Sequence, residues 1–285
     1  MQVSDRGPLT PVVEACAGLT FAPLPVLLSA PPQEQEGIRW WRLDRLVEEG
    51  MIGPAFDAFR ELRGPQQISA ASVHFLKSFG RELIFLAAAG TYLSGRSADL
   101  SPRLVWLPAD ENNLFGDVHI VSSRVAVPSD IADITDITGQ APDTVVVGDE
   151  NELDEWTSAH IMALFGPVID ALSAHTRVGR RTLWGYVVDM LGFYMLNPAR
   201  KLGNDLDLAW RRSERLMNSL LAAGAPIRKE PRLFWFQPEK PSGAWGVRGT
   251  CCFDFRADPE HGYCITCPLE NDTVRQTKFA EAFGD

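Results

Sequence analysis

The chain has 285 residues, enough for one large domain or two modest ones with a buried core. Its 37 acidic and 27 basic residues give a formal net charge of −10. This charge disfavours nucleic acid or an anionic membrane as the main partner, because both select basic surfaces. The composition, 45% hydrophobic and 22% charged, is that of an ordinary soluble globular protein.

Neither a membrane span nor an export signal is predicted. The longest strongly apolar run, residues 83–93, is too short to cross a bilayer as a helix. The N-terminus carries Asp5 and Glu14 and is interrupted by prolines, so it makes a poor signal peptide. We therefore expect a cytoplasmic protein, or one bound peripherally at the inner face of the membrane. In that reducing compartment, clustered cysteines favour metal or redox chemistry over disulfides.

The pattern of apolar residues predicts helices and short strands over residues 1–240. The first 37 residues, rich in proline and alanine, are expected to be irregular. Helical periodicity and capping residues predict helices from Asp44, over 55–63, from Ser69, from Asn151 with a kink at Gly166-Pro167, over 180–197 with a stop at Pro198, over 205–223 and over 274–283. Four β-branched runs between residues 104 and 147 predict strands, and strand-like sequence returns after Pro226.

Two of these helices carry polar residues of interest. In the helix after Ser69, His74, Lys77 and Arg81 fall opposite the apolar stripe, and His74 is expected to be solvated. The helix over 180–197 is apolar nearly all round, which is typical of a buried helix. Asp189 inside it therefore needs hydrogen-bond partners.

Four of the five cysteines lie close together near the end of the chain: Cys251, Cys252, Cys264 and Cys267. Cys16 stands alone and is expected to be a small buried residue. The C-x-x-C pair can bring both of its sulfurs to one metal. Adjacent side chains on a straight strand face opposite ways, so Cys251 and Cys252 must lie at a strand end or a bulge to reach one site.

The ligand type leaves two kinds of metal site open, because thiolates suit both zinc and iron–sulfur clusters. Structural zinc sites usually use two C-x(2–4)-C knuckles, and an adjacent pair suits the larger two-iron cluster better. The spacing therefore favours [2Fe–2S] over zinc. A disulfide is the weakest interpretation for a cytosolic chain.

The cysteine segments resemble a known family. Residues 248–256 (RGTCCFDFR) and 263–269 (YCITCPL) resemble the C-terminal signature of the ferric iron reductase family FhuF, in which R-x-T-C-C-x-x-x-R and C-x-x-C-P-L hold a [2Fe–2S] cluster. Residues 183–185 (LWG) look like a recurrent element of that family. One departure is the loop between the two pairs, which has eleven residues here and typically ten in the family.

The resemblance implies a ferric-siderophore reductase that passes one electron from a [2Fe–2S] cluster to the bound Fe(III), releasing Fe(II) in the cytoplasm for iron assimilation. It makes Cys251, Cys252, Cys264 and Cys267 the cluster ligands and redox centre. The expected fold is α+β: a mostly helical siderophore-binding-like body over 1–240, with a small antiparallel sheet, and a C-terminal cluster segment over 241–285. Such reductases share their body scaffold with siderophore synthetases.

The sequence also indicates the substrate and the electron donor of such a reductase. Candidates for siderophore contact are Arg180, Arg181, Trp184, Trp245 and Arg248. The net negative charge favours a neutral or cationic ferric hydroxamate. Neither G-x-G-x-x-G nor a P-loop is present, so electrons are expected from an external donor such as a ferredoxin or flavodoxin.

Charges in the cysteine segment are expected to tune the cluster potential. The acids Asp254, Asp258 and Glu260 would lower it, whereas Arg248 and Arg256 would oppose them. The alternative function is a non-catalytic binding protein whose four cysteines form a zinc site or an iron–sulfur redox sensor. A siderophore-synthetase-like enzyme is a further alternative, but no ATP-binding motif supports it.

Overall fold

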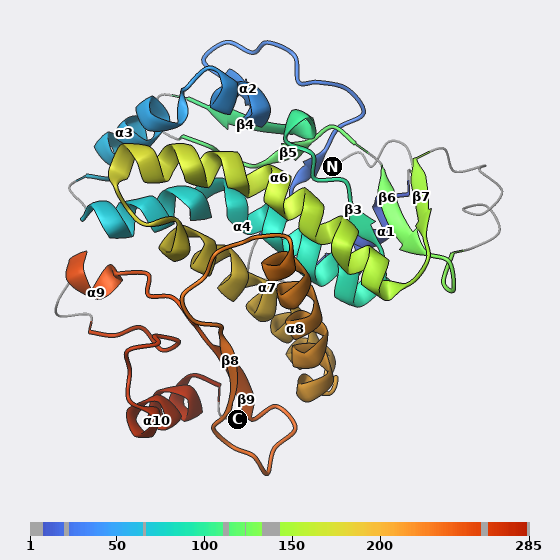
Figure 1. Cartoon of the computed structure of the whole chain (residues 1–285), viewed down its shortest axis with the longest axis vertical. Helices are drawn as coiled ribbons and strands as arrows, with labels where there is room; N and C mark the ends of the chain where they lie inside the picture. Colours follow the sequence, from blue (N-terminus) through green and yellow to red (C-terminus); the bar gives the residue numbers. More distant parts are fainter. Residues whose placement is uncertain are drawn as a thin grey trace.

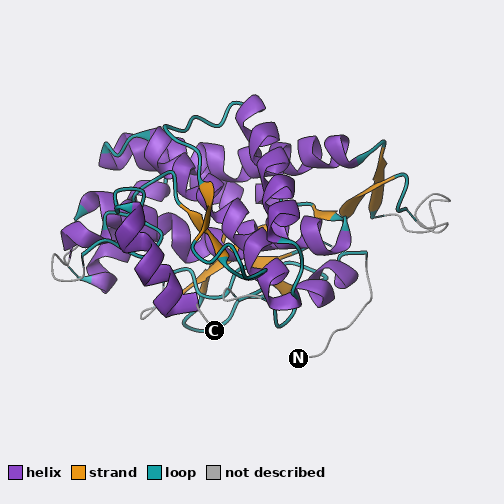
Figure 2. Ribbon diagram, turned by 90° about the horizontal axis from the view of Figure 1, so that it is seen from below, coloured by secondary structure: helices purple, strands orange, loops and turns teal. Residues whose placement is uncertain are grey.

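A computed structural model describes residues 8–19, 23–64, 67–110, 114–122, 124–132, 143–257 and 262–283. The fold is mixed α and β, with helices predominating. Figure 2 shows that helices make up most of the molecule and that the strands are short. They form small separate sheets.

The helices of the described chain are α1 (Thr10–Cys16), α2 (Leu43–Glu48), α3 (Ile52–Arg63), α4 (Ile68–Ser94), the 3₁₀ turn η1 (Pro102–Leu104), α6 (Glu150–Thr176), α7 (Arg180–Leu202), α8 (Leu206–Ala222), α9 (Asp254–Ala257) and α10 (Asp272–Phe283). The strands are β1 (Val26–Leu27), β2 (Arg39–Arg42), β3 (Ser97–Ala98), β4 (Val105–Ala109), β5 (His119–Ile120), β6 (Val125–Pro128), β7 (Thr144–Val147), β8 (Arg232–Trp235) and β9 (Ala244–Val247).

The core is built around α7, which packs against α4 and α8 (Figure 1). Every residue from 183 to 199 is buried, which confirms the prediction from the all-round apolar sequence. α4 in turn packs against α1 and α6. The β8–β9 hairpin lies against α7 and leads directly into the cysteine segment.

The sequence predicted one small antiparallel sheet, and the structure differs from this. The four predicted strands are present as β4 to β7, but the described strands form three sheets, ordered β1-β5-β4-β2, β3-β6-β7 and β8-β9. The pairs β1–β5 and β6–β7 are parallel. Pairing direction follows from long-range packing, which the local alternation of side chains does not encode.

α7 does not stop before Pro198, as the sequence predicted, but continues to Leu202. Proline in a helix loses one hydrogen bond, and burial of Pro198 offsets this loss. The helix ends at Gly203, whose φ of 69° is left-handed. The N–H groups of Gly203 and Asn204 then close the last turn on the carbonyls of Arg200 and Ala199.

The N-terminal region is also more ordered than predicted. Instead of an irregular start, residues 10–16 form α1, whose Val12 and Cys16 are fully buried against the core. Burial of Cys16 confirms its expected role as a small core residue. One helix, α6, has the length and hydropathy to cross a membrane. This is weak evidence of a span, since core helices share those features, and here α6 packs against α3, α4, α7 and α8.

Candidate functional site

The adjacent cysteines do not lie at a strand end or a bulge but in irregular backbone, four residues after β9 ends at Val247. Phe253, the next residue, has a φ of 64°, a left-handed conformation that is uncommon for a residue other than glycine. This bend turns the chain sharply after Cys252 and into α9. Residues 258–261, which include Asp258 and Glu260, lie outside the described residues. They belong to the eleven-residue loop, so the effect of its extra residue on the cysteine geometry lies outside the description too.

Asp189 of α7 holds the backbone immediately before the cysteine pair. Its Oδ1 accepts a hydrogen bond from the Gly249 N–H at 2.7 Å, and its Oδ2 accepts one from the Thr250 N–H at 3.1 Å. The Asp189 side chain is only 1% exposed. Its predicted need for partners is therefore met by a segment sixty residues further along the chain.

Burial raises the pKa of the Asp189 carboxyl to about 7, although the hydrogen bond from Gly249, the charge of Arg248 and the hydrogen bond from Thr250 act in the opposite direction. A carboxylate that fixes two N–H groups in the core is costly to remove, because both donors would then be buried without an acceptor.

Gly185 of α7 makes room for the same segment. A Cβ at Gly185 would overlap the side chain of Thr250. The residue type at this point is therefore set by close approach of the cysteine segment to the helix. The LWG element and the R-x-T-C-C run, noted separately in the sequence, touch each other here.

The four sulfurs form a closed set of neighbours. The Sγ atoms of Cys252 and Cys264 are 3.9 Å apart. Cys251 interacts with Cys252 and Cys267, and Cys267 interacts with Cys264 as well. These contacts raise the pKa of Cys251 and lower that of Cys267, because the thiols share hydrogen bonds. Two thiolates on one tetrahedral metal, with bonds of about 2.3 Å, lie about 3.8 Å apart.

Backbone amides point at two of the sulfurs. The Phe253 N–H lies 3.3 Å from the Cys251 Sγ, and the Leu269 N–H lies 3.5 Å from the Cys267 Sγ. The Cys267 N–H donates to the Cys264 carbonyl at 2.9 Å and closes the C-x-x-C turn. Amide donors of this kind favour anionic sulfur and tune the potential of iron–sulfur sites.

The donor set fits a thiolate-ligated group in composition and proximity. Among the described residues, however, no three or more His, Cys, Asp or Glu side chains surround one position suited to a single metal ion.

Arg248 is the one candidate substrate residue that lies beside the cysteines. Burial acts to lower the pKa of its guanidinium, but the negative charges of Cys264, Cys252 and Asp189 outweigh it and raise the pKa. Its Nε is buried and has no hydrogen-bond partner in the described part of the chain. Arg256 instead lies over the rings of Phe253 and Phe255.

The other candidates for substrate contact lie elsewhere. Trp184 is fully buried in the core, and Trp245 packs against Phe193 and Phe283. Arg180 is on the surface and pairs with Asp170 at 2.6 Å, and Arg181 is exposed. These four residues are not brought together in one pocket.

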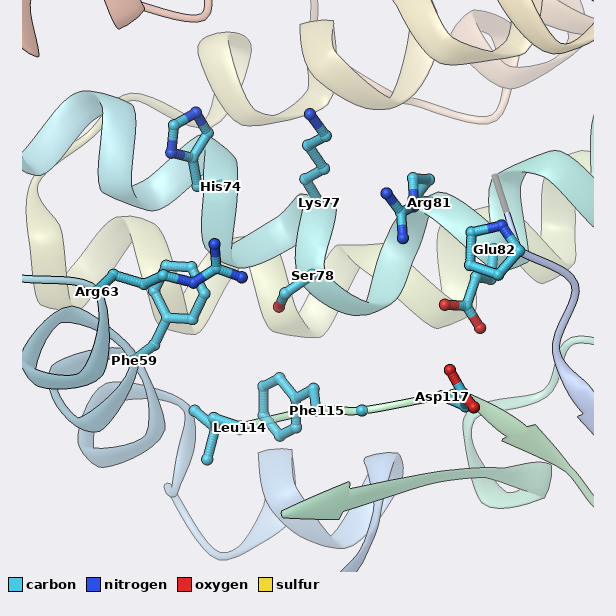
Figure 3. Close-up of a pocket in the computed structure, with 12 residues that line it drawn as sticks. Phe59, Arg63, His74, Lys77, Ser78, Arg81, Glu82, Leu114, Phe115 and Asp117 are labelled. Atoms are coloured by element: carbon cyan, nitrogen blue, oxygen red, sulfur yellow. The ribbon is translucent and has the colours of Figure 1, made fainter. Parts of the chain in front are cut away.

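A cavity that we call the α4 pocket lies between α3, α4 and residues 114–117, with a volume of about 400 Å³. Its lining, drawn as sticks in Figure 3, is Pro23, Phe59, Arg63, His74, Lys77, Ser78, Arg81, Glu82, Leu114, Phe115, Gly116 and Asp117. His74, expected from the sequence to be solvated, is half-buried in this lining, whereas Lys77 lines the pocket and is exposed. Their three-residue spacing predicted a common polar face of the helix, but it could not predict that α3 and residues 114–117 pack opposite this face.

The α4 pocket borders the cysteine segment. The Nε2 of His74 is 2.8 Å from the Oδ1 of Asp254, which follows Cys252 by two residues. α4 and α9 are in contact. The ammonium of Lys77 lies in the electrostatic field of Arg248 and Cys252.

Comparison with known proteins adds no identification. None of the protein-family models matches the chain, and neither a curated protein nor a solved structure matches it significantly.

The first prediction concerns Gly185. Gly185→Ala should lower the free energy of unfolding by about 1–3 kcal/mol, because the new methyl group overpacks against Thr250. The matched control is Gly166→Ala in α6, where the nearest atom, on Trp184, is 3.9 Å from the added Cβ. In this control the gain from helix propensity is opposed by the ring of the following Pro167, so stability should change by less than about 1 kcal/mol. Equal effects in denaturant titrations would contradict the close approach.

The second prediction concerns pH. Because the folded-state pKa of Asp189 is raised from 3.8 to about 7, the folded chain binds more protons than the unfolded chain between those values. The contribution of this group to stability is present below pH 4 and is lost as pH rises to about 7. Asp189→Asn should lower stability overall and flatten that part of the pH profile. An unchanged slope in denaturant titrations between pH 4 and 7 would contradict the assignment.

Proposed function

We propose that this protein is a one-electron reductase of ferric siderophores and that its four clustered cysteines hold a [2Fe–2S] cluster. The observation that carries the proposal is the convergence of two cysteine pairs, with Cys252 and Cys264 3.9 Å apart. The backbone in front of these cysteines is fixed by the buried Asp189. Soft thiolate ligands with amide donors suit such a cluster.

The chemistry that the cluster supplies when bound is the storage and transfer of one electron. A siderophore binds Fe(III) through hard oxygen ligands much more tightly than Fe(II). One electron gained by the iron therefore releases it. The electron comes from an external donor protein of the ferredoxin or flavodoxin class, which is oxidised by one electron in each cycle.

The protein residues around the cysteines have defined electrostatic roles. Arg248 places a cation beside Cys252 and Cys264, which stabilises negative charge on sulfur. The amides of Phe253 and Leu269 act in the same direction. Both effects favour the more negative, reduced state and raise the potential, opposing the lowering expected from the acidic residues of the segment.

The third prediction uses two cysteine variants. Cys252→Ser should abolish the visible absorption of the anaerobically prepared protein. It should also abolish Fe(II) formation in a second assay, in which the protein is reduced with dithionite, freed of excess reductant and mixed with a ferric siderophore. The control, Cys16→Ala, removes the buried cysteine of α1 and should retain both. Full Fe(II) formation by the Cys252 variant would contradict the proposal.

The fourth prediction concerns the electron source. The purified protein mixed with NADPH and a ferric siderophore should not consume NADPH, and addition of a reduced ferredoxin or flavodoxin should start Fe(II) formation. Rapid NADPH oxidation without any second protein, followed by absorbance at 340 nm, would contradict the need for an external donor.

A further inference from the structure

Three basic side chains are spread along the α4 pocket. Arg63 reaches it from the end of α3, while Lys77 and Arg81 come from successive turns of α4 (Figure 3). Phe59 and Phe115 supply apolar wall. A volume of about 400 Å³ falls within the range of about 300–1,000 Å³ for small-molecule sites. The pocket can therefore hold a compact charged ligand.

The cations of the pocket have acidic neighbours, since Asp254 acts electrostatically on Lys77 and Arg81 acts on Glu82. Among the residues that the structure describes, none forms an ion pair with Arg63, Lys77 or Arg81. The Nε of Arg81 is buried without a hydrogen-bond partner. Other cations of the chain are paired, such as Lys278 with Glu270 at 2.7 Å. Arg63 and Lys77 are exposed and Arg81 is half-buried, so all three can form charge-assisted hydrogen bonds with a bound anion.

The acids of the pocket offset its positive charge only in part. Glu82 and Asp117 lie together at the opposite end from Arg63 (Figure 3). Glu82 accepts a hydrogen bond from the Val118 N–H at 3.0 Å, and burial raises its pKa to about 7. Near neutral pH this carboxyl is therefore only partly ionised, and Asp117 is exposed to solvent. Three basic side chains thus line the pocket against one exposed acid and one partly ionised acid, although burial lowers the pKa of Lys77.

We propose that the α4 pocket binds the ferric chelate as an anion, with Arg63, Lys77 and Arg81 contacting negatively charged oxygen ligands of the iron. The favoured chemical class is a compact anionic chelate with carboxylate-type oxygen donors. This inference rests on the proposed reductase function for its metal, and on the pocket alone for its charge.

Local charge here overrides the preference inferred from net charge. The value of −10 favoured neutral or cationic hydroxamates. Charges further away than about 8–10 Å are largely screened at physiological salt, however, whereas the pocket cations would touch the ligand. The contact between His74 and Asp254 also places this pocket next to the cysteine segment, as electron transfer requires.

The fifth prediction tests binding without electron transfer. Gallium(III) has nearly the size of iron(III) but is not reduced, so two complexes serve as probes: trianionic tris(oxalato)gallate(III) and neutral tris(acetohydroxamato)gallium(III). Calorimetry on the whole oxidised protein should show binding of the anion, weakening as salt is added, and much weaker binding of the neutral complex. Equal affinity for the two complexes would overturn the proposal.

Point variants locate the site. Lys77→Gln and Arg81→Gln should each weaken tris(oxalato)gallate(III) binding about tenfold or more, whereas Lys77→Arg, which keeps the charge, should bind nearly as the parent does. The matched control is Lys201→Gln, at an exposed lysine of α7 outside the pocket. Unchanged binding in both pocket variants, with unfolding curves like that of the parent, would refute the assignment.

The two proposals can fail separately. Binding of tris(oxalato)gallate(III) that depends on Lys77, in a protein that never reduces ferric chelates, would refute the reductase function alone. The opposite result has two parts: Lys77→Gln and Arg81→Gln reduce a neutral ferric hydroxamate with full kcat/KM, and the parent protein does not bind the anionic gallium probe. It would refute the anion pocket and leave the reductase function standing.

Discussion

The candidate site depends on the contact between the carboxylate of Asp189 and the backbone amides of Gly249 and Thr250. It joins the most deeply buried helix to the segment that carries the cysteines. Close approach at Gly185 makes this contact possible, because a larger residue would displace Thr250. A short loop rich in thiols, which has little core of its own, is thereby held on a rigid element of the fold.

The parts of the structure that local sequence encodes were predictable. The apolar sequence of α7 indicated burial on all sides, and Asp189 inside it indicated a polar contact in the core. Which segment supplies that contact could not be predicted, because the partner lies sixty residues away. The same holds for Pro198, where local preference indicated a helix end but core packing extends α7 by another turn.

The site shows the same division between local and long-range information. Adjacency of Cys251 and Cys252 indicated a strand end or a bulge, but the pair lies in irregular backbone beyond β9, with the left-handed Phe253 directly after it. The face of α4 with Lys77 and Arg81 was visible from helical spacing, but spacing does not reveal what lies opposite a face. Only the packing of α3 and residues 114–117 turns that face into a pocket, and so changes the expected substrate charge.

The account as a whole stands on the identity of the group held by the four cysteines. The most direct measurement is the iron, acid-labile sulfide and zinc content of the anaerobically purified whole protein, combined with electron paramagnetic resonance of the dithionite-reduced form. The account predicts about two iron atoms and two sulfide ions per chain and a signal from one unpaired electron. A colourless protein with one zinc ion per chain and no sulfide would contradict it.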